Sequence, residues 1–252
     1  MALIDFSCIH MVWLRDIIRY FREKSQLYGS IMRPILWLFI LGMGLRGSFQ
    51  LSNHVTYTQF IFPGIVAMTV VFTSVQSAVT IIWDREFGFL KEILVAPVPR
   101  TSIAIGKCLS GTTLSLIQAG IILLLSPFVR VKIHPAAILP LILVIAITAF
   151  ALSGVGVLIA SRMTSFQGFG TIMNFAVMPM WFLSGAMFPP ENLPGWLDIL
   201  VRLNPLTYGV DLMRHLLINI SYYPPLFEMS FLIIFSLVIL IFAVLSFNRG
   251  EY

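Results

Sequence analysis

Six long apolar runs constrain the fold of this 252-residue chain more than any other feature of its sequence. They extend approximately over residues 30–45, 60–83, 108–129, 136–161, 168–188 and 226–247. A helix needs about 20 predominantly apolar residues to cross a hydrocarbon core of about 30 Å, and in lipid the backbone must satisfy its own hydrogen bonds. Charged residues make up only 11% of the chain, whereas a soluble domain has about 25%. We therefore expect an all-α membrane protein with six transmembrane helices.

The distribution of positive charge predicts how these spans are oriented, because Lys and Arg accumulate in the cytoplasmic loops of membrane proteins. With a cytoplasmic N-terminus, eleven of the 16 Lys and Arg residues lie on the cytoplasmic side. Both termini are then cytoplasmic, and we expect a multi-pass protein of the cell (inner, cytoplasmic) membrane. This topology accounts for the net charge of +5 without a nucleic-acid partner.

Residues 1–28 have the pattern of an amphipathic helix that lies in the plane of the membrane. Apolar side chains recur at spacings of three and four from Phe6 to Tyr20. Trp13 suits the headgroup level, and three arginines lie along another side, where we expect them to face anionic lipid. These arginines are Arg15, Arg19 and Arg22. The pattern predicts a cytoplasmic interface helix in contact with membrane lipid.

A charged loop, residues 84–107, separates the second apolar run from the third. Phe87, Leu90 and Leu94 form one apolar helical stripe. The charges around this stripe belong to Arg85, Glu86, Lys91 and Glu92. The two prolines of the APVP sequence end the helix, since proline lacks an amide donor, and a restart is expected near Thr101. A short helix with an apolar ridge suits a groove on a partner protein; the alternative is a helix lying on lipid.

One face of the second run carries polar side chains at helical spacing. They are Thr69, Thr73, Gln76, Ser77 and Thr80. Ser, Thr and Gln join helices in lipid by hydrogen bonds, so this face has two interpretations, packing or dimer contact and the lining of a substrate path.

Proline and glycine residues interrupt the chain after the fifth run, within an expected external segment at 189–225. Trp196, Leu200 and Leu203 predict a one-sided helix. Asn204 can cap the helix that follows, and Pro205 fits its first position. We expect two short external helices between spans 5 and 6. Four charged side chains of this region are expected to be solvated or paired surface groups, namely Asp198, Arg202, Asp211 and Arg214.

Several kinds of chemistry are missing from the sequence. No charged residue or histidine falls in the middle of a predicted span, although proton- and ion-coupled transporters generally need one there. The phosphate-binding pattern G-x-x-x-x-G-K-[ST] is absent. Cys8 and Cys108 form no metal motif and are expected to be packing residues. The histidines are scattered over separate segments, at His10, His54, His134 and His215. We therefore expect no catalytic residue, metal or cofactor on this chain, so uphill transport needs energy from another subunit; a stand-alone channel is the alternative.

Three stretches carry a family resemblance: REFGFLKEILVAPVPR at 85–100, FLSGAMFPPENLP at 182–194 and LNPLTYGVDLMR at 203–214. Together with FIFPG at 60–64, they resemble the membrane subunits of type-2 ABC exporters, which include drug-resistance and lipo-oligosaccharide export proteins. The resemblance covers nearly the whole chain. It implies one transmembrane domain over 1–252 that works with a second copy or a paralogous permease. Two nucleotide-binding subunits would then bind the ATP and Mg.

The resemblance also implies roles for individual residues. Arg85 to Val95 would form the coupling helix, which docks on the ATPase. Its docking residues would be Arg85, Glu86, Phe87, Gly88, Leu90, Lys91, Glu92 and Leu94. The external gate would include Asn204, Pro205, Leu206 and Tyr208. The implied function is export of an amphiphilic small molecule, drug or lipid-linked sugar; polysaccharide or glycolipid export within the same superfamily is the alternative.

Overall fold

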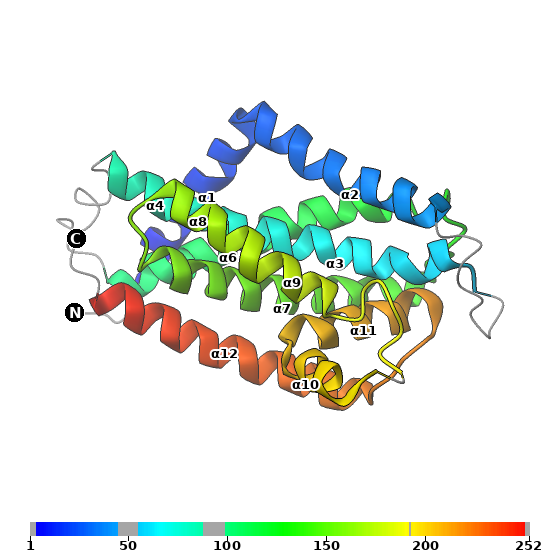
Figure 1. Ribbon diagram of the computed structural model, residues 1–252. Helices are drawn as coiled ribbons and strands as arrows, with labels where there is room; N and C mark the ends of the chain where they lie inside the picture. The colour runs from blue at the N-terminus through cyan, green and yellow to red at the C-terminus, as the bar shows by residue number, and fades with distance from the viewer. Residues whose placement is uncertain (1–3, 45–54, 88–98, 192, 250–252) are drawn as a thin grey trace.

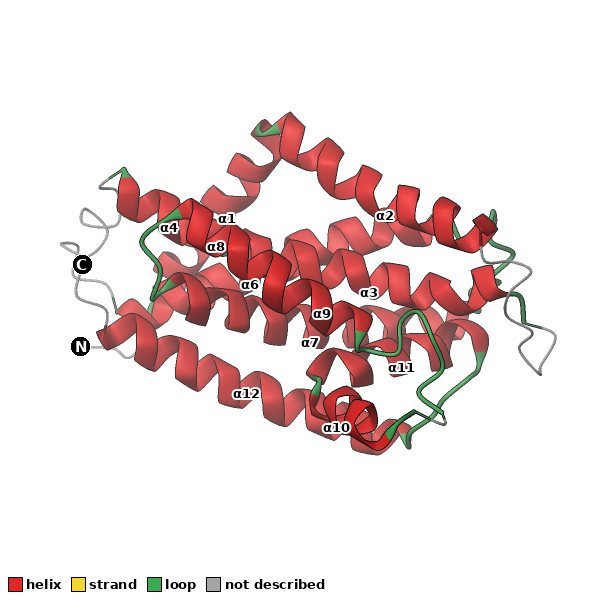
Figure 2. Ribbon diagram, in the orientation of Figure 1, coloured by secondary structure: helices red, strands yellow, loops and turns green. Residues whose placement is uncertain are grey.

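The computed structural model describes residues 4–44, 55–87, 99–191 and 193–249. Every regular element within these ranges is a helix (Figure 2), which confirms the all-α class. In chain order the elements are α1 (Phe6–Arg22), α2 (Lys24–Gly44), α3 (Tyr57–Ser77), α4 (Val79–Glu86), α6 (Arg100–Leu123), α7 (Pro135–Ala160), α8 (Phe166–Ile172), the π-helical η1 (Met173–Val177), α9 (Met178–Phe182), α10 (Gly195–Leu203), α11 (Pro205–Ile218) and α12 (Pro225–Arg249).

Four helical stretches of the described residues are long and apolar enough to cross a membrane. They are Tyr57–Glu86, which combines α3 and α4, then α6, α7 and the Pro225–Phe247 part of α12. These match the second, third, fourth and sixth predicted runs. Residues 30–44 of the first run lie within α2, and residues 168–182 of the fifth are divided among α8, η1 and α9. The total of six spans stays a prediction.

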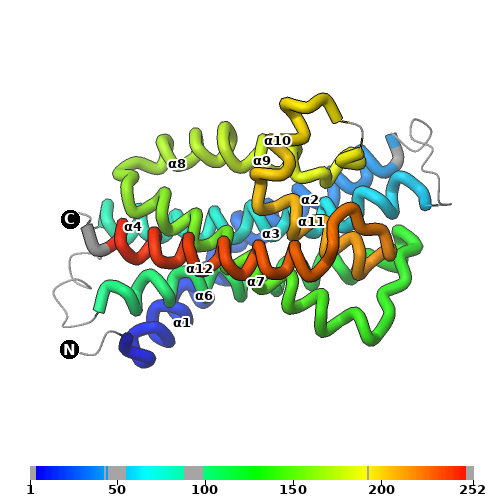
Figure 3. Tube along the Cα trace, turned by 90° about the horizontal axis from the view of Figure 1, so that it is seen from below, coloured from blue at the N-terminus to red at the C-terminus, as the bar shows by residue number. Residues whose placement is uncertain are grey.

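The core of the bundle lies around α3. All residues from Phe60 to Val71 are buried, as is typical of a helix that is apolar on every side. α3 packs against α2, α6, α7 and α11, and α7 packs against α12. In Figures 1 and 3 these long helices run side by side along the length of the molecule.

Local signals in the sequence set several helix ends. α6 begins at Arg100, one residue before the predicted restart and directly after Pro99. The Asn204 side chain accepts the Leu206 amide at 3.0 Å, and Pro205 is the first residue of α11, as predicted.

The predicted third span, residues 108–129, extends beyond the end of the corresponding helix in the structure. α6 stops at Leu123, and the chain turns through residues 124–130 before α7. Pro127 explains this end, because a proline inside the helix would remove a hydrogen bond and clash with the preceding turn. The run was apolar enough for a longer helix, but its composition does not reveal where the backbone turns.

The two ends of the bundle are formed by different elements. α4 ends and α6 begins at one end, on either side of residues 88–98, and α12 ends there as well (Figures 1 and 3). α10 and α11 lie toward the opposite end. We call these the 88–98 end and the α10–α11 end.

Candidate functional site at the 88–98 end

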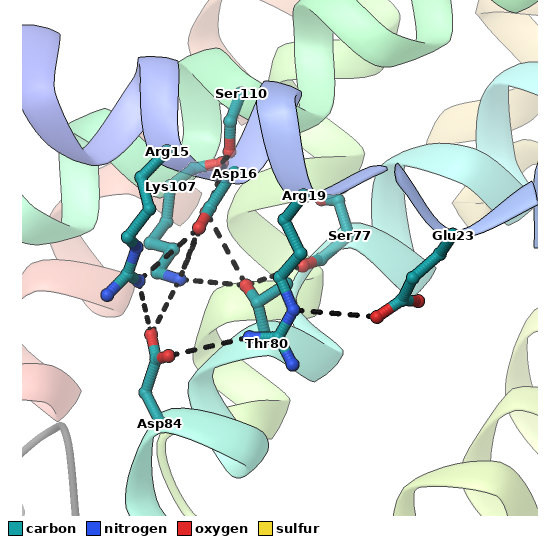
Figure 4. Close-up of polar contacts among 9 residues, drawn as sticks. All are labelled: Arg15, Asp16, Arg19, Glu23, Ser77, Thr80, Asp84, Lys107 and Ser110. Carbon is teal, nitrogen blue, oxygen red and sulfur yellow. Dashed lines mark hydrogen bonds and ion pairs between the residues drawn. The ribbon is translucent and has the colours of Figure 1, made fainter. Parts of the chain in front are cut away.

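A buried cluster of charged side chains joins α1 to α4 and α6 (Figure 4). Lys107 Nζ lies 3.0 Å from Asp16 Oδ2 and 3.0 Å from Asp84 Oδ2. Arg15 Nη2 lies 2.5 Å from Asp84 Oδ2 and 3.3 Å from Asp16 Oδ1. The two cations therefore balance the two carboxylates. Charges removed from water need such pairing, because an unpaired charge in the interior is costly.

Hydroxyl groups complete the interior of this cluster. Lys107 Nζ donates to Thr80 Oγ1 at 2.8 Å, so the ammonium has three partners. Ser110 Oγ donates to Asp16 Oδ2 at 3.3 Å. A buried polar network restricts the helices that it joins when its members are hydrogen-bonded.

Arg19 extends the cluster toward the surface. Its Nη1 lies 3.7 Å from Asp84 Oδ1, and its Nε lies 3.6 Å from Glu23 Oε1. The guanidinium also lies over the Trp83 ring, 4.7 Å from the centroid. Arg19 is thus held from three sides.

These contacts correct the prediction for the interface helix. A helix is present at the predicted place as α1, and its position at the membrane surface stays a prediction. Arg15 and Arg19 point toward buried carboxylates instead of lipid. Trp13 Nε1 donates to Thr113 Oγ1 of α6 at 3.0 Å, so its indole also turns inward. Arg22 remains exposed. The exposed apolar side of α1 instead consists of Phe6, Met11, Leu14, Ile18 and Phe21.

The cluster flanks the predicted coupling helix on both sides. Asp84 lies four residues before residues 88–98, and Lys107 lies nine residues after them. Arg85 donates to the carbonyl oxygens of Met163 and, at 3.0 Å, Ser161, which fixes the end of α4 against the α7–α8 connection.

Only part of the predicted docking set lies in the described residues. Glu86 and Phe87 are exposed, and the Phe87 side chain is 68% accessible. The remaining docking residues fall outside the described ranges, namely Gly88, Leu90, Lys91, Glu92 and Leu94.

The polar face predicted on the second span borders two cavities. The first has a volume of about 240 Å³ and lies between α2, α3 and η1; we call it the Arg33 cavity because Arg33 lines it. The second, about 370 Å³, is lined by Asp16 and is called the Asp16 cavity. Thr69, Thr73, Gln76 and Ser77 line the first cavity, and Gln76, Ser77 and Thr80 line the second.

The same face also makes hydrogen bonds between helices. Thr73 Oγ1 donates to Gln118 Oε1 of α6 at 2.9 Å, and Gln118 Nε2 donates to Ser30 Oγ at 2.5 Å and to Tyr20 Oη. The polar side chains therefore connect helices and also line cavities, and Thr73 does both; a substrate path or a dimer contact stays a prediction.

Arg33 lies deeper in its helix than the sequence predicted. α2 begins at Lys24, so Arg33 is in the middle of a helix of 21 residues and not at its start. The prediction that no charge lies in the middle of a span depended on a first span that began at residue 30. α2 is not among the four stretches of the described residues that are long and apolar enough to cross a membrane, so that prediction stays a prediction.

At the α10–α11 end, the structure brings three of the resemblance motifs together. Arg214 Nη2 donates to the Gly185 carbonyl oxygen at 2.5 Å, and its guanidinium lies 4.4 Å from the Phe60 ring centroid. Its Nη1 lies 3.3 Å from Asp211 Oδ1. Arg214 is only 1% exposed. The prediction of surface positions for Asp211 and Arg214 is therefore wrong, because their mutual pairing allows both to be buried.

The other predicted pair of this region is on the surface, as expected. Arg202 Nε lies 2.8 Å from Asp198 Oδ2, and the Arg202 side chain is 61% exposed. A pair this exposed is screened by solvent.

The predicted gate residues lie together at the start of α11. Asn204 Nδ2 donates to the Met180 carbonyl oxygen at 2.5 Å, and Tyr208 Oη donates to the Arg202 carbonyl oxygen at 2.8 Å. Leu206 is fully buried, and Pro205 is half-buried. These contacts tie α11 to α9 and α10; a gating role stays a prediction.

Sequence reasoning missed the centre of the charged cluster, Asp16 with Asp84 and Lys107. One signal was available, because Asp16 is the only acidic residue of α1 and lies beside Arg15. Its partner Lys107 is 91 residues away, and no local pattern connects the two.

The sequence matches the ABC-2 type transporter family over residues 8–218. It is 34% identical to the transport permease ycf38 of Cyanophora paradoxa over 228 residues, 86% of this chain and 77% of the relative. It is 27% identical to nodulation protein J of Rhizobium leguminosarum bv. viciae (81% and 79% covered) and 24% identical to the inner membrane transport permease YadH of Escherichia coli K12 (95% and 94%). The chain therefore belongs to the ABC-2 type transporter family of membrane permeases, which generally pair with an ATPase subunit.

Proposed function

We propose that the chain is the transmembrane permease subunit of an ATP-driven exporter, with its energy supplied by a separate ATPase subunit. The proposed cargo is an amphiphilic small molecule, a drug or a lipid-linked sugar. The observation that carries the proposal is the buried cluster of Asp16, Asp84 and Lys107, which ties α1 to both flanks of the predicted coupling helix. A segment that receives force needs firm attachment to the helices that move.

In the proposed mechanism, Arg85 to Val95 dock in a groove of the ATPase. Movement of this segment passes directly into Tyr57–Glu86, which is one long helical stretch. It also reaches α6 and α1 through the ion pairs of Lys107. α1, α3 and α6 then move as a unit, and the cavities between them change shape.

The proposed assembly contains two permease domains, each spanning 1–252, as a homodimer or with a paralogous permease. Two ATPase subunits bind the ATP and Mg, and this chain binds neither. The 88–98 end and both termini are cytoplasmic in the cell membrane. The α10–α11 end is external, with the gate around Asn204 and Tyr208.

Co-purification from native membranes tests this function. The wild type is compared with a Phe87→Ala/Glu92→Lys variant, which removes an exposed apolar contact and reverses a charge in the coupling segment. Phe128→Ala is the matched control, because Phe128 is 84% exposed in the turn after α6, at the opposite end of the bundle. We expect an ATPase subunit with the wild type and the control, and its loss, or loss of transport-linked ATPase activity, in the variant. If no ATPase accompanies any of the three, the proposal is wrong, and ion conductance of the purified chain in liposomes would then indicate a channel.

A further inference from the structure

We propose that the Arg33 cavity binds the anionic headgroup of an amphiphile, with Arg33 as the cation that recognises it. The inference rests on the proposed export function and names the chemical class of its cargo. The ligand has a phosphate or carboxylate headgroup and an apolar tail.

The position of Arg33 supports this assignment. It lies in the middle of α2 and lines the cavity. Within the described residues no carboxylate forms an ion pair with it. Its guanidinium lies 5.1 Å from the Phe72 ring centroid, a contact that holds the cation without neutralising it. An anion at this point would supply the missing partner.

The lining of the cavity supports it as well. No carboxylate lines it among the described residues, whereas Gln26 and Gln76 supply amide groups. Neither amide has a hydrogen-bond partner in the described part of the chain, so both are available to a ligand. The hydroxyl of Thr73, in contrast, is already bonded to α6. Among the residues that the structure describes, the cavity thus combines unbonded amide groups with a cation that has no carboxylate partner.

The Arg33 cavity can be compared with the Asp16 cavity. The two cavities share lining residues, among them Tyr20, Gln26 and Gln76, so they adjoin each other. The Asp16 cavity contains the carboxylates of Asp16 and Glu23, and Arg19, its cation, is already paired with carboxylates. The charges around the Asp16 cavity thus balance one another, whereas Arg33 has no carboxylate partner among the described residues, so an anion is bound more favourably in the Arg33 cavity.

The size of the cavity bears on the apolar part of the ligand. A volume of about 240 Å³ lies below the roughly 300–1,000 Å³ that a whole drug-sized ligand occupies. The cavity therefore suits a headgroup, and the tail must lie outside it. α2 continues past Arg33 with an exposed apolar side that includes Leu36, Phe39 and Ile40. An acyl or isoprenoid chain can lie along this side.

The test measures binding to the full-length permease in nanodiscs of phosphatidylcholine. The two probes are fluorescent phosphatidic acid and fluorescent diacylglycerol with the same chains, so they differ only in the phosphate. We expect the wild type to bind the phosphate-bearing probe about tenfold more tightly, as charge-assisted hydrogen bonds are the strong ones. Arg33→Gln removes this preference without changing diacylglycerol binding. Arg33→Lys keeps most of it.

Two further variants make the result specific to the cavity. Gln76→Leu keeps the charge but removes a free amide, and we expect it to weaken phosphatidic acid binding several-fold. Arg202→Gln is the matched control, because it removes an arginine charge from the exposed pair on α10, and its binding should equal that of the wild type. If Arg33→Gln does not give monodisperse protein, Gln76→Leu decides the question.

Three results would overturn the inference: no headgroup preference in the wild type, a preference that survives Arg33→Gln, or displacement of the lipid probe by excess inorganic phosphate, which would indicate a site for free anions. Lipid binding requires no ATPase, so the result of the binding test is independent of whether an ATPase co-purifies with the permease. An ATPase partner without headgroup preference refutes only the cavity assignment. Headgroup preference without an ATPase refutes only the proposed energy source.

Discussion

Replacing Lys107 with methionine removes the cation that two buried carboxylates share. The side chains of Lys107, Asp16 and Asp84 are 2%, 3% and 5% exposed, and both N–O distances are 3.0 Å. Loss of one partner from a buried ion pair costs about 3–5 kcal/mol, because the remaining charge stays in a medium of low dielectric constant. Arg15 still contacts both carboxylates. We therefore expect the free energy of unfolding to fall by about 3 kcal/mol, the lower end of that range.

Equilibrium unfolding by SDS in mixed micelles, followed by tryptophan fluorescence, measures this change. Arg202→Met is the control from the same chain, because it removes one exposed cation with one carboxylate partner. An exposed pair is screened by solvent, so the control should leave stability nearly unchanged. The methionine introduced at Lys107 is unbranched and adaptable, which limits the effect of changed packing.

A double variant separates charge from packing. Asp16→Asn in the Lys107→Met background removes the carboxylate that has lost its nearest cation. We expect the two changes together to cost about 1–3 kcal/mol less than the sum of the single changes, as for residues in contact within one network. The reasoning fails if Lys107→Met costs no more than Arg202→Met, or if the two costs simply add.

Three other predictions follow from single contacts. Gly64→Ala places a methyl group 2.6 Å from the Ala186 carbonyl oxygen, so we expect a loss of about 1–3 kcal/mol in the same unfolding assay; an unchanged midpoint would contradict this close approach. Asp211 accepts two backbone amides and pairs with a buried guanidinium, so Asp211→Asn should lower the thermal midpoint much more than Asp198→Asn, and equal effects would contradict its burial. Cys8 and Cys108 are buried, and burial raises the pKa of the Cys8 thiol, which leaves less thiolate at pH 7. Maleimide should therefore label neither cysteine until SDS is added. Rapid labelling of the native protein would refute the packing of α1.

The sequence predicted the helices and their breaks well, because these depend on properties of neighbouring residues. A stretch such as Ala136 to Ser161 is apolar over the length of a span, and the structure has α7 at Pro135–Ala160. Pro99 marks a helix start because it has no amide donor. Asn204 marks another because its side chain accepts a hydrogen bond from a backbone amide of the first turn. The end of α6 at Leu123 was missed although Pro127 marks it, because the prediction followed the apolar composition of the run.

The candidate site was predictable only in part. The polar face of the second span was found because its spacing is local to one helix. Which of these polar side chains bond to α6 and which line the Arg33 cavity depends on the helix that lies opposite each of them. The depth of Arg33 depends in turn on the start of α2 at Lys24, ahead of the apolar run.

By itself, then, the sequence determined an all-helical chain with long apolar helices and the order of several helix starts and ends, because hydrophobic periodicity and helix signals act over a few residues. Only the tertiary structure decided which charges are buried and with which partners. Arg15 and Arg214 both read as surface cations, yet one meets Asp84 across 69 residues and the other lies over Phe60 in the interior. A buried charge is stable only beside its partner, and that partner is set by how distant helices pack.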